Sequence, residues 1–93
     1  MRSASYLKHV RSFPCLLCRR PADDAHHLRH AEGGLSGVAR KVGDEWTVPL
    51  CRFCHNELHT TGDEELFWIK KRIDPEDWAK VSYSQWNDQK TTR

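Results

Sequence analysis

Long apolar runs are missing from the sequence, and apolar residues are scarce overall. None of the 93 residues lies in a stretch that approaches the roughly 20 apolar residues of a membrane helix, so we expect no membrane contact. The first 13 residues carry four basic side chains and no apolar run, which argues against a secretory signal and favours a cytoplasmic location. A chain of 93 residues forms one domain at most. With 38% apolar residues its core is small, so we expect a metal, disulfides or oligomerisation to add stability.

A strong charge of one sign is also missing. The net charge is +2, from 15 Lys and Arg against 13 Asp and Glu. This balance permits a nucleic-acid partner without requiring one. Because disulfides are disfavoured in the cytoplasm, the four cysteines favour metal binding over cross-links.

Periodicity and turn residues predict a small α+β domain over residues 1–93, with a core at about 15–68. The helix expected at 3–12 is followed by short strands at 25–30 and 46–48, the second of them ended by Pro49, with a glycine-rich loop in between. Later helices are expected at 52–60, at 63–72 with Leu66, Phe67, Ile69 and Ile73 as the apolar face, and from Asp74 onward. These C-terminal helices cover 63–86, and a frayed tail covers 87–93.

The cysteines form two pairs of identical spacing. Cys15 and Cys18 are separated by two residues, as are Cys51 and Cys54, and 32 residues lie between the pairs. Two such pairs supply the four tetrahedral ligands of a structural zinc ion, and a site closed in this way leaves no position for a substrate. Free buried thiols and a redox dithiol are the alternatives.

The second cysteine pair fits one further motif. Cys51, Cys54 and His55 match the Cys-x-x-Cys-His pattern of covalent haem attachment. The lack of an export signal, the second cysteine pair and the few apolar residues available to wrap a porphyrin argue against this interpretation.

Four of the six histidines fall into a pattern that suits an open metal site. His55 and His59 are four residues apart, so one helix face carries both imidazoles. His26, brought over by the first strand, would be a third ligand and would leave positions open for water and substrate. Strand alternation sends His27 to the opposite face, where a neutral imidazole can act as a general base.

Other interpretations of the histidines stay open. His55 and His59 could replace cysteines in the structural site or merely decorate the helix surface. His9 and His30 are expected to be solvated surface groups.

Taken together, these motifs resemble the HNH (ββα-metal) endonuclease superfamily. The resemblance runs from Cys15 to about Trp68 and rests on the cysteine pairs, on Ala25-His26-His27, on Val48-Pro49-Leu50-Cys51 and on His55 and His59. The His-His and His-x3-His arrangement is similar to that of the bacterial DNase colicins. The wider pattern is closer to small phage and prophage HNH proteins of the Ref type.

The resemblance implies a ββα fold with flanking helices around one catalytic divalent cation. It makes His27 the general base and His26, His55 and His59 the metal ligands, while the four cysteines hold a structural Zn²⁺. The middle Asn of the family pattern has no counterpart in the stretch Asp44-Glu45-Trp46-Thr47, and we take Asp44 to orient the His27 loop in its place. Asn56 follows the second cysteine pair and is not taken for that residue.

The function implied is hydrolysis of DNA phosphodiester bonds, by nicking or cutting, with low sequence specificity. The cation is Mg²⁺, Mn²⁺, Ni²⁺ or Zn²⁺; three imidazole ligands suit the softer ions better than magnesium. Arg29 and Arg40 are expected to contact phosphates, with Arg19, Arg20 and Lys41 as further candidates. A recombination or packaging protein is a further expected partner. The alternative function is an inactive zinc module that binds nucleic acid or protein.

Overall fold

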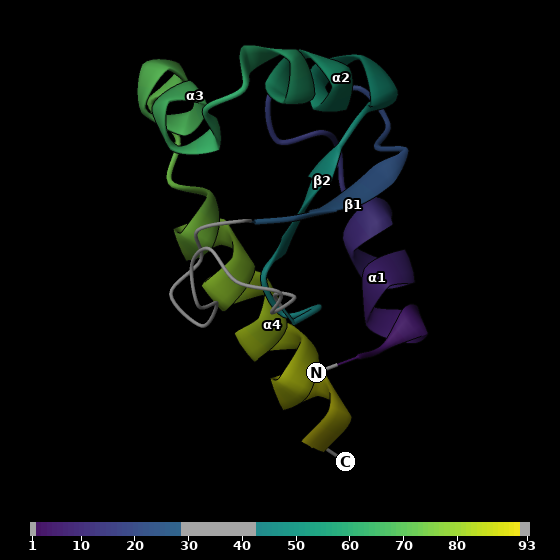
Figure 1. Cartoon of the computed structure of the whole chain (residues 1–93). Helices are drawn as coiled ribbons and strands as arrows, with labels where there is room; N and C mark the ends of the chain where they lie inside the picture. Colours follow the sequence, from purple (N-terminus) through teal and green to yellow (C-terminus); the bar gives the residue numbers. More distant parts are fainter. Residues whose placement is uncertain (1, 29–42, 92–93) are drawn as a thin grey trace.

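The computed structural model describes residues 2–28 and 43–91, which form a small α+β unit with a two-stranded sheet and four helices, as the sequence predicts. In chain order the elements are α1 (Ala4–Arg11), β1 (Asp24–His27), β2 (Thr47–Leu50), α2 (Arg52–Thr61), α3 (Glu64–Lys71) and α4 (Pro75–Thr91). Figure 1 shows that α2 continues directly from the end of β2, while α1 and α4 lie beside the strand pair.

The two strands pair antiparallel over their full length. Asp24 lies opposite Leu50 at one end, and His27 lies opposite Thr47 at the other. All of β2 is buried, whereas β1 is fully buried only at His26. Because side chains alternate along a strand, His26 points into the molecule and His27 points to its partly exposed side.

The prediction that Pro49 ends the second strand is wrong, because β2 continues through Pro49 to Leu50. The backbone N–H of Leu28 donates to the Trp46 carbonyl at 2.9 Å, so Leu28 and Trp46 form a hydrogen-bonded pair. Hydrogen-bonded and non-bonded pairs alternate along an antiparallel ladder, so the backbone nitrogen and carbonyl of Pro49 face away from β1. Proline therefore removes no bond of the ladder. The outward carbonyl of Pro49 accepts from the Leu16 N–H at 2.9 Å.

Helix α2 begins and ends where the sequence predicts within one residue. The Cys51 sulfur caps its first turn by accepting from the Cys54 N–H, and Asp23 accepts from the Arg52 N–H at 2.7 Å. Gly62 ends the helix with φ +84°, a left-handed conformation that glycine adopts without a Cβ clash. The helix start is thus tied to the cysteine pair.

The starts of α3 and α4 are also those predicted. Asp63 caps α3 by accepting from the Leu66 N–H at 3.0 Å, and Asp74 accepts from the Glu76 and Asp77 N–H groups. The predicted apolar face of α3 needs correction. Phe67 is buried as expected, but Leu66 and Ile69 are 41% and 65% exposed. Trp68 is buried in their place, because α3 packs through the side that carries it.

The last helix extends past residue 86, where the prediction ended it. Helix α4 continues to Thr91, since no helix breaker follows residue 86 and Gln89 is a good helix former. None of the helices in the described ranges is long and apolar enough to cross a membrane.

An aromatic layer joins α1 to α4. Tyr6 is fully buried, and its hydroxyl donates to Ser82 of α4 at 3.1 Å. His9 is half-buried, not a fully solvated surface group as predicted: the centroid of its ring lies 4.8 Å from that of Trp86 and 5.0 Å from that of Phe13. His9 lies in the last turns of α1 and contacts Trp86 of α4, so the packing of the two helices covers one side of its ring.

The main core lies between the strand pair, α2 and α3. Its buried members are Cys15, Leu28, Val48, Leu50, Cys51, Cys54, Leu58, Phe67, Trp68 and Ala79. Three of the four cysteines belong to this core, so whatever the sulfurs bind also holds the core together.

Candidate functional site

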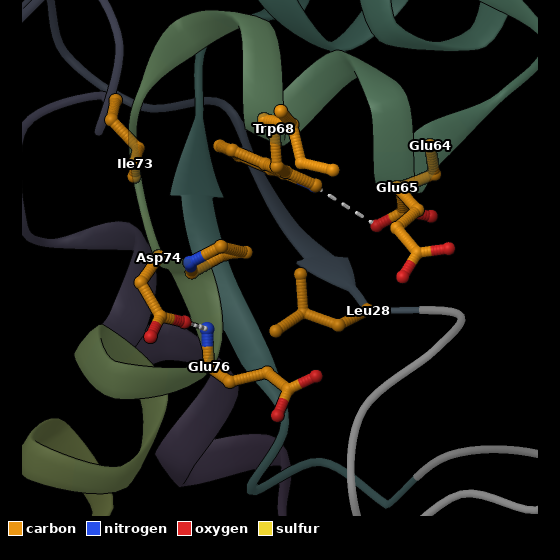
Figure 2. A pocket seen from close by; sticks show the side chains of 9 residues that line it. Leu28, Glu64, Glu65, Trp68, Ile73, Asp74 and Glu76 are labelled. Atoms are coloured by element: carbon orange, nitrogen blue, oxygen red, sulfur yellow. Dashed lines mark hydrogen bonds between the residues drawn. The ribbon is translucent and has the colours of Figure 1, made fainter.

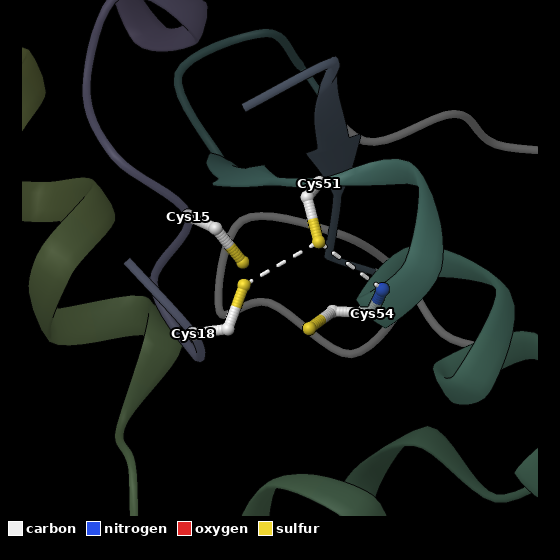
Figure 3. Close-up of side chains that lie close together, drawn as sticks. All are labelled: Cys15, Cys18, Cys51 and Cys54. Atoms are coloured by element: carbon white, nitrogen blue, oxygen red, sulfur yellow. Dashed lines mark hydrogen bonds between the residues drawn. The ribbon is translucent and has the colours of Figure 1, made fainter. Parts of the chain in front are cut away.

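The four cysteines meet where the loop after α1 approaches the start of α2 (Figure 3). Their sulfurs lie within 4.8 Å of one another, and the sulfurs of Cys18 and Cys51 are 3.5 Å apart. A disulfide needs about 2.05 Å between sulfurs. Four thiolates at about 2.3 Å from one zinc ion lie about 3.8 Å apart. The cluster therefore has the spacing of a four-cysteine zinc site.

Backbone bonds hold the first cysteine pair in place. The Cys15 N–H donates to the Arg20 carbonyl (2.7 Å), and the Arg19 N–H donates back to the Cys15 carbonyl (3.0 Å). Arg19 adopts a left-handed backbone with φ +69° to close this turn. The bond from Leu16 to Pro49 joins the turn to β2, so the sulfurs are positioned by the fold itself.

The surroundings of the four sulfurs shift the pKa values of the thiols in opposite directions. Burial raises the pKa of Cys15, but backbone N–H groups that donate to its sulfur outweigh this effect and lower the pKa to about 7. Burial and the neighbouring thiols both raise the pKa of Cys54 far above its usual value. Four sulfurs this close cannot all be thiolates unless a positive ion lies among them, and a zinc ion would supply that charge.

A second cluster joins His26 of β1 to His55 and His59 of α2. One ring nitrogen of each lies within 4.8 Å of the others. The Nε2 atom of His55 is 3.0 Å from His26 Nδ1 and 3.2 Å from His59 Nε2. Three nitrogens at about 2.0–2.1 Å from one tetrahedral ion lie about 3.3 Å apart, so this donor set also fits a divalent metal.

The histidine cluster is separate from the cysteine cluster. The alternative in which His55 and His59 replace cysteines is wrong, because the four cysteines complete a group of their own. His26 is buried, His55 is half-buried and His59 is exposed, so the histidine cluster opens to solvent on the His59 side.

Carboxylates contact the far nitrogens of two of these histidines. Glu64 Oε2 lies 3.0 Å from His26 Nε2, and Asp24 Oδ2 lies 2.9 Å from His55 Nδ1. Burial raises the pKa of Asp24, but hydrogen bonds from His55 and Arg52 outweigh it and keep the pKa below its usual value. Such carboxylates behind metal-binding histidines fix the tautomer and the ring orientation.

His27 and Asp44 form a pair on the other side of β1. Asp44 Oδ1 is 2.8 Å from His27 Nε2, and Asp44 Oδ2 accepts from the Ser3 N–H at 2.7 Å. Burial raises the pKa of Asp44, but the bonds from His27 and Ser3 outweigh it, so the pKa lies below its usual value. The Thr47 hydroxyl donates to the Asp44 carbonyl and fixes the turn before β2. An ionised Asp44 therefore holds the ring of His27, whose side chain is 40% exposed.

Comparison with known proteins identifies the family. The family model described as "Protein of unknown function (DUF968)" matches residues 1–71, which include both clusters and the His27–Asp44 pair. The chain belongs to the DUF968 family. The described residues of this DUF968 chain that follow the match form α4 and the turn before it.

The DUF968 chain is also similar to the "Uncharacterized protein YdfU" of Escherichia coli (strain K12). The two are 48% identical over 56 residues, a match that covers 59% of this chain and 15% of YdfU. The match thus spans a small part of the relative's length. No solved structure matches the chain.

The structure brings together most of the residues singled out in the sequence. The cysteines meet, the three histidines meet, and Asp44 contacts His27. Arg29 and Arg40 lie outside the described residues, as does Lys41. Arg19 and Arg20 are exposed beside Cys18.

Two carboxylates of the site were missed in the sequence. Asp24 had a usable signal, because it lies two residues before His26 and strand alternation puts both on one face. Glu64 had none, since its contact with His26 depends on how α3 packs against the strands.

Proposed function

We propose that this DUF968 chain is a metal-dependent endonuclease of the HNH (ββα-metal) type that hydrolyses DNA phosphodiester bonds. The observation that carries the proposal is the contact between His27 and Asp44. His27 directly follows His26 in the sequence, and His26 belongs to the cluster of three imidazoles. Metal-assisted hydrolysis requires a general base, a carboxylate that orients it and an open metal site nearby.

The order of the elements supports the same proposal. β1 supplies His26 and His27, β2 returns antiparallel to it, and α2 follows with His55 and His59 on one face. Strand, strand and helix around one ion is the arrangement that the ββα resemblance implies. The four-cysteine zinc site fixes the start of α2, and with it the position of His55, which directly follows Cys54.

Each residue of the site has a role in the proposed hydrolysis. Asp44 accepts the Nε2 proton of His27, so the lone pair on Nδ1 is available to take a proton from the attacking water. His26, His55 and His59 hold the cation, with Glu64 and Asp24 behind two of them. When bound, the cation polarises the phosphodiester and stabilises the leaving 3′ oxygen.

The chemistry of the ligands favours some cations over others. Three imidazoles form a softer donor set than carboxylates, which favours Zn²⁺, Ni²⁺ or Mn²⁺ over Mg²⁺. The substrate is DNA held through its phosphates in the cytoplasm, and the exposed Arg19 and Arg20 are the described residues best placed to add phosphate contacts. Arg29 and Arg40 stay as further phosphate contacts that we expect from the sequence, and a recombination or packaging protein stays as an expected partner.

One observation favours a second function. The cysteine cluster ties the loop after α1 to β2 and α2 without any help from the histidines, so a zinc module that only binds nucleic acid or protein would keep this fold. We place it second because such a module has no use for a His27–Asp44 pair beside a triple-histidine cluster.

Plasmid relaxation separates the two functions. The protein with one zinc per chain is treated with EDTA, freed of the chelator, and incubated with supercoiled plasmid and Mg²⁺, Mn²⁺, Ni²⁺, Co²⁺ or Zn²⁺. Relaxed or linear product that depends on added metal supports the nuclease. DNA that stays supercoiled with every ion, although each ion is shown to bind, supports the binding module instead.

A further inference from the structure

A buried carboxylate lies behind the deepest histidine of the cluster. Glu64, in the first turn of α3, is 7% exposed, and its Oε2 atom is 3.0 Å from His26 Nε2. The same oxygen accepts from the Trp68 indole N–H at 3.2 Å, a bond drawn in Figure 2. The oxygen of Glu64 that contacts His26 is therefore also held by Trp68, which lies one turn further along α3.

We propose that Glu64 is a positioning residue for metal binding, which holds His26 as the Nε2–H tautomer and so turns the Nδ1 lone pair toward His55 and His59. This inference rests on the proposed function in so far as His26 is taken as a metal ligand. It adds that α3, which follows the strand–strand–helix unit in the chain, is part of the metal site.

The hydrogen bonds leave little choice of tautomer. An indole N–H is a donor only, so Trp68 holds Oε2 of Glu64 as an acceptor. An acceptor at 3.0 Å from Nε2 stabilises the tautomer that carries its proton on that nitrogen. The other nitrogen, Nδ1, is the one that lies 3.0 Å from His55 Nε2 inside the cluster.

The charge of Glu64 suits the same arrangement. A buried carboxylate is costly unless it is paired and hydrogen-bonded. The charge of a divalent cation, transmitted through the imidazole of His26, would stabilise it. Glu65, the next residue of α3, is exposed and also lines the pocket seen in Figure 2, so it offers a control.

The test compares two substitutions of similar volume. Glu64→Leu removes the acceptor and fills the space, whereas Glu64→Gln keeps an oxygen that can accept from both His26 and Trp68. Each variant, with zinc in the cysteine site, is titrated with Co²⁺. Visible d–d absorption reports cobalt in the histidine cluster, and the lack of a thiolate-to-cobalt band shows that the cysteines keep their zinc. Glu65→Ala is the control.

We expect Glu64→Leu to weaken Co²⁺ binding by about 10–100-fold, Glu64→Gln to weaken it less, and Glu65→Ala to leave it unchanged. Long-range ¹H–¹⁵N spectra before cobalt addition should show His26 as the Nε2–H tautomer in the wild type and in Glu64→Gln, and as a mixture in Glu64→Leu. Should Glu64→Leu lose its zinc, Glu64→Leu/Trp68→Phe replaces it, because that pair leaves no indole donor unpaired.

The inference would be overturned if Glu64→Leu bound cobalt as tightly as the wild type and kept His26 as the same tautomer. So would a wild-type protein whose histidine cluster binds no cobalt. A protein that binds cobalt in the expected order of affinities yet cleaves no DNA would refute the proposed nuclease while leaving the role of Glu64 intact.

Discussion

Asp44 Oδ1 lies 2.8 Å from Nε2 of His27, and this contact joins the turn before β2 to the end of β1. The HNH pattern has an Asn in this region, and the chain has none between Gly43 and Cys51. Both side chains end in an oxygen that accepts an N–H bond, so Asp44 can hold the imidazole as an amide would.

The first prediction concerns this contact. We expect Asp44→Ala to slow single-turnover plasmid cleavage by about 10-fold or more, because the His27 ring loses its orientation. Asp44→Asn should keep most of the rate, since its amide oxygen still accepts from His27 Nε2. Equal rates for Asp44→Ala and the wild type, at equal zinc content, would show that the contact does not serve the reaction.

The second prediction concerns acid stability. Because the folded-state pKa of Asp44 lies below the unfolded value of about 3.9, the unfolded chain binds a proton at higher pH than the folded chain does. Asp44 thus contributes stability that is complete above about pH 4 and is lost as the pH falls through the folded pKa. Burial raises the pKa and so reduces this contribution, which comes from the hydrogen bonds that His27 and Ser3 donate.

Urea unfolding over a range of acidic pH values measures this effect. The free energy of unfolding of the wild type should fall more steeply below about pH 4 than that of Asp44→Asn. Loss of zinc in acid affects both proteins alike, so only their difference is informative. Parallel curves would mean that Asp44 has the same pKa in the folded and unfolded chain.

The third prediction concerns Cys18, which is exposed although its three partners are buried. As a free surface thiol, Cys18 would tolerate Cys18→Ser without consequence. As a zinc ligand, its loss should release the tightly bound zinc and destabilise the fold by at least about 2 kcal/mol, or about 10 °C in Tm. Zinc analysis and thermal unfolding check this, with Ser84→Ala of exposed α4 as the control. Unchanged zinc content and Tm would argue against a four-cysteine site.

Local signals in the sequence were sufficient for the helix starts and for the pairs of cysteines and histidines that share a turn or a helix. Asp63 and Asp74 mark helix starts through bonds to their own neighbours, and Gly62 ends α2 through its left-handed backbone, so these boundaries are readable from short stretches. The spacing of the cysteine pairs and of His55 and His59 likewise determines which side chains share a turn or a helix face.

The features that were mispredicted or missed depend on contacts between distant elements. Pro49 is accommodated because its nitrogen faces away from β1, which follows from the strand register. His9 is half-buried because α4 packs beside α1. Glu64 reaches His26 across 38 residues of sequence, and no local pattern foretells where α3 will pack.

The role of His27 as the general base is tested by the effect of His27→Ala on cleavage at fixed metal occupancy. The side chain of His27 is 40% exposed and lies outside the three-histidine cluster, so its removal should leave zinc content, Co²⁺ affinity and DNA binding as in the wild type. We expect single-turnover cleavage by this variant to fall by about 10²–10⁴-fold, because in the proposed mechanism no other group takes the proton of the attacking water. Cleavage at the wild-type rate, by a His27→Ala protein that binds metal and DNA normally, would contradict the proposed mechanism.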